Sequence, residues 1–289
     1  MNVENKDISV NLEQMQKIEF DILKYIKDVC DRNGVIYYLA YGTLIGAVRH
    51  SGFIPWDDDI DIHMAREEYF RFVEILKMNP HPYYKLVSRD TDKAFTAPLP
   101  KVIDTRINLI QDYGFIEKVT LGPYVDIFIL DGAGNSIEEA YRTHAEANVL
   151  YRNWNRADMK FLIPNSNLMM DILHFVRNIP AKLRGYYYWL NELDSYCAKK
   201  SFFDMDYISA LESGEYESKK AVWNKEDFGS GTVKVFNGVE FRVPINFDRI
   251  LKQIYGDYME LPEKSKRVSH HRYELEIVDK SILEMACEK

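Results

Sequence analysis

The segment Trp56-Asp57-Asp58-Asp59-Ile60-Asp61 restricts the folding of this chain more than any other feature of its sequence. Its closely spaced carboxylates repel one another and need a counter-ion when they are ionised. From Asp59 onward the sequence alternates Asp-Ile-Asp-Ile, which predicts a strand with Asp59 and Asp61 on one face and both isoleucines in the core. Two such carboxylates can converge on a hard divalent ion such as Mg²⁺. An acidic loop or a helix N-cap would explain the composition alone equally well.

A glycine turn lies upstream of the acidic segment. The run from Val35 to Ala40 predicts a strand, Tyr41-Gly42-Thr43 breaks it, and Leu44 to Val48 predicts a short helix. Gly42 would let a phosphate approach the backbone closely, and Thr43 adds a hydroxyl beside the helix N-terminus. A turn glycine is the more common explanation. Together with the acidic segment, however, the pattern indicates a site that holds a nucleotide phosphate beside a metal ion.

A third carboxylate is expected from a neighbouring strand. The apolar run from Tyr124 to Leu130 predicts such a strand and contains Asp126. Burial of an aspartate is costly unless the carboxylate is paired or bound to a metal ion, so Asp126 is the best candidate. Asp131, at the end of the strand, is the second choice, and it is also suited to capping the following turn.

Other segments predict an α+β fold with a mixed sheet that carries acidic residues on two strands. Apolar spacing predicts a helix from Leu12 to Val29 that ends near Asn33-Gly34. Asn237-Gly238 predicts a type I′ hairpin over 232–243. Further strands are predicted at 84–88, 99–104 and 108–111, helices at 65–77 and 247–255, and a mainly helical region from 136 to about 210 that is interrupted at Pro164 and Pro180.

Composition and charge exclude several classes of protein. With 289 residues and a formal net charge of −8, the chain is a poor candidate for non-specific nucleic-acid binding, and we expect no nucleic acid as a partner. The three cysteines have no disulfide or zinc spacing, which favours reduced thiols. The polar first ten residues lack an apolar signal core, and no run approaches the ~20 apolar residues of a membrane helix. We therefore expect a cytoplasmic protein, working at the inner face of the membrane.

At the glycine turn, the acidic segment and the strand that contains Asp126, the sequence resembles the LicD family. That family is similar to the fukutin-related transferases and has the nucleotidyltransferase fold. The matching blocks run from Tyr41 to His50, from Gly52 to Asp61, from Tyr124 to Asp131, and near the C-terminus through Tyr255-Gly-Asp-Tyr-Met259, Leu261-Pro262, Lys266-Arg267 and a following histidine. The resemblance spans residues 12 to 271 approximately. It implies a catalytic core over 1–135, a helical region over 136–220 that contacts the acceptor or a membrane surface, and a C-terminal hairpin and helix over 221–289 that pack on the core.

The resemblance implies a phosphocholine transferase that uses CDP-choline or a related CDP-alcohol and acts on a sugar hydroxyl of a surface glycan, such as teichoic acid or lipopolysaccharide. Asp59, Asp61 and Asp126 would hold Mg²⁺, with Mn²⁺ as an alternative, and the acceptor hydroxyl would be either bound to the metal or activated by Asp58 or Asp57. Ile129 departs from the family, which often has proline there. The helical region matches weakly, so the acceptor stays open.

Further candidates bind the donor. They are Gly42, Thr43, Arg49, His50, Trp56 and Lys101, with Arg106 as a weaker phosphate ligand. A quaternary ammonium group binds to aromatic faces, for which the candidates are Trp56, Tyr41, Tyr37 and Tyr38. Surface charge is the alternative for the basic residues, and core packing is the alternative for the aromatic ones.

The stretch from Phe161 to Leu190 is amphipathic, aromatic and basic, with Arg177, Lys182 and Arg184 interleaved. Such a segment can lie on a membrane interface, where it would meet an acceptor carried on a lipid. An ordinary buried helical pair is the alternative interpretation.

Three other functions use much the same residues. One is transfer of ribitol phosphate or glycerol phosphate from a CDP donor. Another is transfer of a nucleoside monophosphate from a triphosphate by a true nucleotidyltransferase. The last is a metal-binding or regulatory domain without activity, against which the three carboxylates argue.

Overall fold

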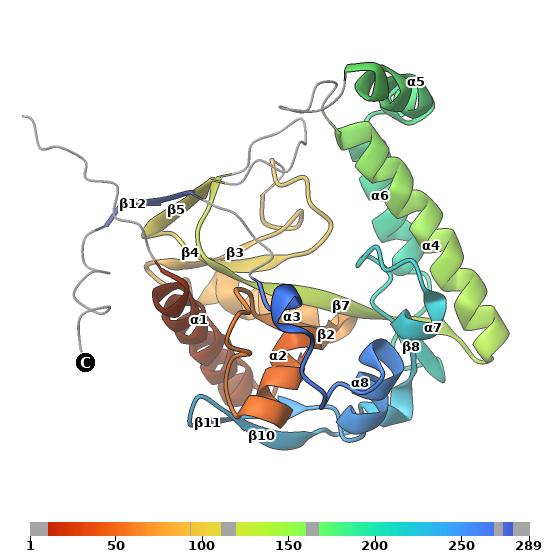
Figure 1. Cartoon of the computed structure of the whole chain (residues 1–289). Coiled ribbons are helices and arrows are strands. Elements are labelled where there is room, and N and C mark those ends of the chain that lie inside the picture. Colours follow the sequence, from red (N-terminus) through yellow and green to blue (C-terminus); the bar gives the residue numbers. More distant parts are fainter. Residues whose placement is uncertain (1–10, 93, 111–119, 160–167, 269–273, 280–289) are drawn as a thin grey trace, which may run out of the picture.

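The computed structural model describes residues 11–92, 94–110, 120–159, 168–268 and 274–279. Its centre is a twisted mixed β-sheet (Figure 1), as predicted from the sequence. In spatial order the main strands are β1 (Tyr38–Leu39), β2 (Asp61–Ala65), β7 (Tyr124–Gly134), β4 (Lys101–Asp104) and β3 (Tyr84–Val87). Strands β2 and β7 are parallel, and the other pairs in this row are antiparallel.

Smaller strands extend or flank this sheet. The far end of β7 pairs with β8 (Tyr207–Ser209), which pairs with β9 (Val222–Asn224). A separate three-stranded sheet consists of β12 (Glu274–Ile277), β5 (Ile107–Ile110) and β6 (Thr120–Leu121). Sequence patterns missed β6, β8, β9 and β12, because each is short and depends on pairing with a distant segment. The strand predicted at 108–111 is β5, and Gln111 lies outside the described residues.

Helix α1 (Leu12–Asn33) forms where apolar spacing predicts it. The Asn11 side chain accepts a 2.9 Å hydrogen bond from the Gln14 N–H, and the Gln14 side chain accepts one from the Asn11 N–H, which makes a capping box. Gly34 ends the helix in the left-handed conformation, with φ 63°, as its place after Asn33 predicts. Both ends of α1 are therefore specified locally.

The main core lies on one face of the sheet. There the side chains of Ile62 on β2 and of Val125 and Ile127 on β7 pack against α1 and against α3 (Arg66–Met78). The opposite face carries the alternate residues of both strands, among them Asp61 and Asp126. This alternation positions the candidate site.

The predicted hairpin is confirmed and joins the main core. Strands β10 (Thr232–Phe236) and β11 (Val239–Val243) are connected by Asn237 and Gly238, whose φ angles of 47° and 78° fit the predicted turn. The Phe236 side chain is buried in the main core. The remaining short elements are α2 (Tyr41–Ile45), the π-helix η1 (Gly46–His50), α7 (Ser218–Ala221), η2 (Lys225–Asp227), α8 (Phe247–Tyr255) and η3 (Lys264–Lys266).

The middle of the chain forms α4 (Ile137–Asp158), α5 (Leu168–Arg184) and α6 (Tyr186–Cys197). Helices α4 and α6 lie side by side, and α5 lies at their end that is remote from β7 (Figure 1). The prediction that Pro180 interrupts the helical region is wrong, since this residue lies inside α5. Its exposed position leaves water free to bind the carbonyl that loses its N–H partner. Pro164 lies outside the described residues.

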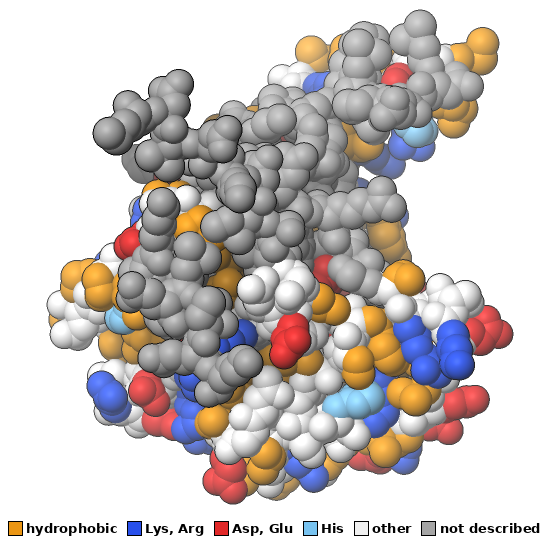
Figure 2. All heavy atoms as spheres, turned by 60° about the vertical axis from the view of Figure 1, so that its left-hand side comes forward, with side chains coloured by type: hydrophobic (Ala, Val, Ile, Leu, Met, Phe, Trp, Pro, Cys, Tyr) orange, Lys and Arg blue, Asp and Glu red, His pale blue; other side chains and the backbone are white. Residues whose placement is uncertain are grey.

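Within the described residues, no helix has both the length and the apolarity needed to cross a bilayer. Figure 2 shows acidic and basic side chains interspersed over the lower part of one face of the molecule. Cys30 and Cys197 are buried free thiols, and Cys287 lies outside the described residues.

Candidate active site

Two carboxylates and an amine form a row across three neighbouring strands. Asp61 on β2 lies directly opposite Asp126 on the parallel strand β7, and Asp126 lies opposite Lys101 on β4. Partners in register on adjacent strands share a face, so these three side chains project together. The Lys101 ammonium forms an ion pair with the Asp126 carboxylate and lies 3.7 Å from the centroid of the Tyr124 ring. Lys101 therefore balances the charge of Asp126, whereas a charged Asp61 would need another cation as its partner.

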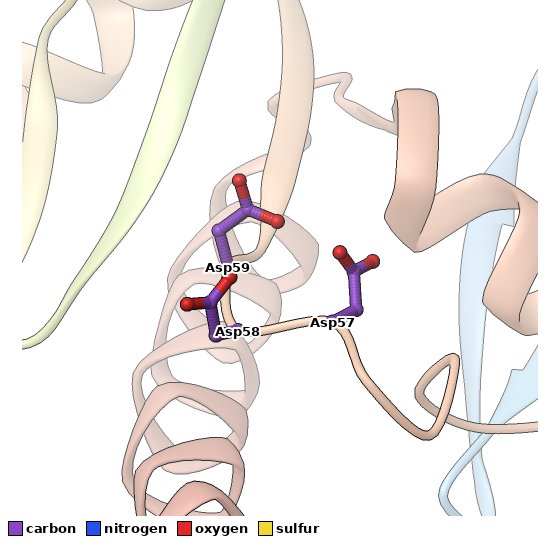
Figure 3. A group of neighbouring side chains, drawn as sticks. All are labelled: Asp57, Asp58 and Asp59. Atoms are coloured by element: carbon purple, nitrogen blue, oxygen red, sulfur yellow. The ribbon is translucent and has the colours of Figure 1, made fainter. Parts of the chain in front are cut away.

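The other acidic residues lie in the loop before β2. Ligand oxygens of Asp57, Asp58 and Asp59 lie within 4.8 Å of one another, and Figure 3 shows the three carboxylates pointing to the same side of the loop in front of α1. The prediction that Asp59 begins the strand is wrong, because β2 begins at Asp61. Strand β1 turns into α2 at Tyr41, so the chain before Asp61 has no β1 partner to extend the pairing. The loop brings three adjacent side chains together, which strand alternation would not allow.

Gly42 and Thr43, which were predicted to lie in a turn before the helix, belong to the first turn of α2 and contact this acidic loop. A Cβ atom on Gly42 would lie 2.6 Å from Oδ2 of Asp57, so a larger residue here would displace that carboxylate from its present position. The Thr43 hydroxyl is buried and accepts a 2.9 Å hydrogen bond from the Asp61 N–H. The structure thus shows both residues positioning the acidic segment, while their contact with a donor phosphate stays a prediction.

Helix α1 adds a carboxylate that the sequence analysis missed. Glu19 is only 2% exposed, and its Oε2 has no hydrogen-bond partner within the part of the chain that the structure describes. Burial raises the pKa of Glu19 well above its usual value, and the charges of Asp59 and Asp58 raise it further. The sequence did hold a signal, because Glu19 interrupts the apolar face that Met15 and Ile22 define. A charged residue on a buried helix face requires a partner.

The pKa of Asp61 is raised in the same way as that of Glu19. Burial raises the pKa of its carboxyl group well above the usual value, and the charges of Asp59 and Asp126 add to that effect. The Lys101 ammonium opposes them without reversing the direction. A buried group of mutually repelling carboxylate oxygens is the chemistry that suits a hard divalent cation, so the residues present fit Mg²⁺ or Mn²⁺.

A cavity of about 460 Å³ adjoins the acidic loop, and Trp56, Arg49 and Tyr255 help to line it. The Tyr255 hydroxyl is close enough to Asp61 and Asp57 to interact with their charges. The Arg267 guanidinium lies 5.4 Å from the centroid of the Trp56 ring, so this indole already accepts a cation on its face. The cavity therefore offers an aromatic surface next to the acidic loop, although none of the candidate metal-binding carboxylates lines it.

Arg49 and His50, which were predicted to clamp phosphate, are hydrogen-bonded to each other but line different cavities. Nη1 of Arg49 donates hydrogen bonds to the carbonyl oxygens of Tyr258 and Glu260, and its Nε donates to Nε2 of His50 at 2.9 Å. His50 lines a different cavity, beside Phe53 and the N-terminal turns of α1. Arg49 thus ties the C-terminal segment to the core, and a role of either residue in phosphate binding remains a prediction.

Several aromatic candidates belong to the core. Tyr37 and Tyr38 are 1% and 4% exposed, so the prediction that they help to form an open choline site is wrong. Tyr41 packs its ring edge to face against Phe128 at 4.8 Å. Its buried hydroxyl interacts with the charge of Asp61, which places Tyr41 between core and site. Trp56 is the aromatic candidate that the structure leaves beside the cavity.

Two charged candidates are engaged elsewhere. Asp131 lies on the sheet face opposite Asp126, where it accepts two hydrogen bonds from the Arg66 guanidinium at 2.6 and 2.8 Å. The choice of Asp131 as an alternative third carboxylate is therefore wrong, because residues five positions apart on a strand point to opposite faces. Arg106 binds Asp104 and stacks 3.7 Å from the centroid of the Tyr83 ring, which accounts for its charge.

The mixed sheet with Asp61 and Asp126 on adjacent strands lies within a stretch of the chain that matches a nucleotidyltransferase domain. A family model described as "LicD/FKTN/FKRP, nucleotidyltransferase domain" matches residues 34–154. Over 275 residues the chain is 30% identical to the lipopolysaccharide cholinephosphotransferase LicD of Haemophilus influenzae, a match that covers 93% of this chain and 99% of that protein. The chain therefore belongs to the LicD family, as its motifs indicated.

A shorter match relates the chain to the ribitol 5-phosphate transferase FKRP of Homo sapiens. The two are 42% identical over 45 residues, which amount to 16% of this chain and 9% of that protein. The mouse protein of the same name matches over the same share of both chains. Asp57–Asp61 and Asp126 lie within the residues that the family model matches, and Glu19 lies outside them.

Proposed function

We propose that this chain transfers phosphocholine from CDP-choline to a sugar hydroxyl of a cell-surface glycan, such as teichoic acid, and releases CMP in a Mg²⁺-dependent reaction. The observation that carries the proposal is the in-register pair Asp61 and Asp126 beside the acidic loop. The end-to-end match to a protein named as a cholinephosphotransferase supports the choice of donor. We place the reaction in the cytoplasm, where CDP-alcohols would be met.

Asp59, Asp61 and Asp126 would hold the metal ion, and the buried Glu19 carboxylate would add negative charge behind them. When bound, Mg²⁺ supplies charge neutralisation for a pyrophosphate and its leaving group. Lys101 keeps Asp126 in place through its ion pair, and Thr43 fixes the first residue of β2. The chain's own contribution is thus a rigid set of oxygen ligands on a buried sheet.

In the proposed reaction, the acceptor hydroxyl oxygen forms a bond to the phosphorus that carries choline. The bond from that phosphorus to the bridging oxygen of CMP breaks, and CMP leaves with the bond's electrons. The hydroxyl proton passes to a carboxylate of the acidic loop, for which Asp58 and Asp57 are the candidates. The indole of Trp56 offers a face for the quaternary ammonium of choline.

A panel of CDP-alcohols tests the donor directly. The purified protein should release CMP faster from CDP-choline than from CDP-ribitol or CDP-glycerol when Mg²⁺ and a glycan acceptor are present. The measurement is CMP by chromatography, together with mass analysis of the acceptor. CMP release that does not depend on choline would exclude the phosphocholine proposal and leave the fold assignment intact.

A second function, transfer of ribitol phosphate or glycerol phosphate, is favoured by the local match to a ribitol 5-phosphate transferase. It uses the same carboxylates, and a preference for CDP-ribitol or CDP-glycerol in the panel would establish it. A true nucleotidyltransferase would instead convert a nucleoside triphosphate and release pyrophosphate. Assay of both products separates the two chemistries.

Replacement of Glu19 by Gln should weaken Mn²⁺ binding by about tenfold, because a supporting group behind metal ligands commonly contributes this much. The metal-free variant should be at least as stable as the parent chain, since Gln cannot ionise at a position where burial and the neighbouring aspartates disfavour the charged carboxylate. Isothermal titration with Mn²⁺ measures the first effect, and thermal unfolding measures the second. Glu13→Gln is the control, because Glu13 lies exposed on the same helix. Equal Mn²⁺ affinity in both variants would contradict a role for Glu19.

A further inference from the structure

Helix α5 presents its apolar side chains to solvent. Single exposed apolar residues are common on proteins, but a continuous stripe of them marks an interaction surface. The exposed fractions of Met169 and Leu183 are 72% and 82%, so both side chains are largely open to solvent. The apolar stripe of α5 consists of Met169, Ile172, Leu173, Val176, Ile179 and Leu183. Figure 2 shows hydrophobic and basic side chains together on the projecting upper part of the molecule, which corresponds to α5 in Figure 1.

The polarity of α5 is the reverse of that of a helix on an ordinary protein surface. Asp171 and Asn178 are 5% and 2% exposed, and their spacing of seven positions puts them on one face. That face packs against α4 and α6. The apolar residues recur every three or four positions on the other side, over the full length of the helix. The apolar side of α5 therefore points away from the protein's own core.

Polar contacts fix the helix in this orientation. The Lys182 ammonium donates a 3.2 Å hydrogen bond to the carbonyl of Ala157 at the end of α4. The Trp189 indole N–H on α6 donates a 3.0 Å hydrogen bond to the carbonyl of Ala181. Rotation of α5 to bury its apolar stripe would break these bonds and expose the buried carbonyls. The stripe is thus held outward by the fold.

Positive charge borders the apolar stripe. Arg177 and Arg184 are exposed and one helical repeat of seven apart, so they lie along one edge of it. The acidic residue of the helix, Asp171, is on the buried face. The chain as a whole carries −8, so this edge is a basic site on an acidic protein. An apolar stripe with a basic edge complements an anionic lipid surface.

A second copy of the chain is a poorer occupant. A symmetric contact through the middle of the stripe, near Val176, would bring Arg177 close to its own symmetry mate, since two-fold interfaces are self-complementary. No acidic side chain on the exposed side of α5 would balance that charge. A lipid surface supplies both the apolar layer and the phosphate groups.

We propose that α5 docks the chain onto an anionic membrane surface. The apolar stripe enters the boundary between headgroups and acyl chains, and Arg177 and Arg184 bind lipid phosphates. The helix lies in the plane of the membrane, with α4 and α6 leading from it to the catalytic sheet. This docking does not depend on which donor the active site uses, and its test measures binding alone.

Co-sedimentation of the full chain with vesicles tests the proposal. The chain should bind vesicles of phosphatidylcholine mixed with phosphatidylglycerol more tightly than vesicles of phosphatidylcholine alone. The double variant Met169→Gln/Leu183→Gln should bind the mixed vesicles on the order of tenfold more weakly. The variant Arg177→Gln/Arg184→Gln should lose about fivefold per arginine on the mixed vesicles and little on the neutral ones.

A matched control is available on the same chain. Met78 and Val278 are 71% and 58% exposed outside α5, so Met78→Gln/Val278→Gln removes similar exposed apolar groups. This control should keep full binding, and thermal unfolding should show that every variant folds. The proposal is overturned if the parent chain binds neither vesicle type, if it binds both equally, or if the control variant loses as much binding. It is also overturned if the α5 substitutions abolish a dimer in sedimentation without changing vesicle binding.

Discussion

Replacement of Asp61 by Asn should reduce turnover by roughly a thousandfold or more, because the variant would lose a ligand of the metal ion that stabilises the transition state. Asp61 lies at the start of β2, opposite Asp126 and beside the acidic loop, so its carboxylate is central to the proposed ion site. Asn has nearly the same shape but carries no negative charge. Steady-state release of CMP from the CDP-alcohol, at saturating Mg²⁺, measures the effect.

The same substitution should not destabilise the metal-free protein at neutral pH. Burial raises the pKa of Asp61, so the fold favours its protonated form. The contribution of this carboxyl group to stability is therefore full at low pH and is lost as pH rises through its raised pKa. A neutral Asn avoids that loss. Without metal, the variant Asp61→Asn should thus unfold at the same temperature as the parent chain or above it.

The exposed residue Asp28 on α1 provides the control, since its Asn variant should retain both turnover and metal response. Added Mg²⁺ or Mn²⁺ should raise the melting temperature of the parent chain and of Asp28→Asn, but not that of Asp61→Asn. Undiminished turnover in the Asp61 variant would refute the proposed role of this residue. A global loss of structure would show instead that the carboxylate is needed for folding.

Replacement of Arg66 by Met should lower the free energy of unfolding by about 3–5 kcal/mol, because it leaves buried carboxylates without their partner. The Arg66 guanidinium binds Asp131 through two hydrogen bonds and binds Glu212 at 3.1 Å. Both acids are almost fully buried. Urea unfolding, followed by circular dichroism, measures the difference between variant and parent chain.

The loss of unfolding free energy in Arg66→Met should increase with pH. Burial raises the pKa of Asp131 to about 6 and that of Glu212 to about 7 even with Arg66 present. An acid whose pKa is raised in the folded state destabilises the protein as pH increases and the acid ionises. The loss of stability in Arg66→Met should therefore be smallest near pH 3.8 to 4.5, the ordinary pKa values of the two acids, and largest above about pH 7. A penalty that is constant with pH would contradict this account.

Arg32, whose side chain is 79% exposed, offers the control for Arg66. Its Met variant should change the free energy of unfolding by no more than about 0.5 kcal/mol. The double variant Arg66→Met/Asp131→Leu should lose less stability than the sum of the two single variants, because it removes one of the unpaired charges. Additive losses would show that the two residues do not form the pair that the structure shows.

Local patterns in the sequence predicted most of the elements that position the site. The alternation of Ile60 and Ile62 with aspartates predicted a strand with one apolar face, and both isoleucines are fully buried. The apolar run around Asp126 predicted the strand that became its neighbour. Helix α1 and the Asn237-Gly238 hairpin are specified by caps and turn residues that act over a few positions. These features are local, so a single sequence contains them.

What the sequence did not reveal depends on contacts between distant segments. Glu19 became part of the site because α1 packs behind the acidic loop, and no pattern near Glu19 specifies that arrangement. Asp131 was kept as an alternative although its odd spacing from Asp126 puts it on the other sheet face, where Arg66 from another element binds it. The start of β2 was placed two residues early because the end of β1 sets it. For Glu19 and for the start of β2, tertiary pairing decided between alternatives that the local sequence allowed equally.

The parallel pairing of β2 with β7 also bears on how the protein folds. Asp61 and Asp126 are far apart along the chain, and α3 and strands β3 to β6 lie between the two strands that carry them. The entropy of closing so long a segment must be lost before such a contact can form. A cation held by these carboxylates would therefore find its ligands only in the completed sheet, so it would slow unfolding while leaving the rate of folding nearly unchanged.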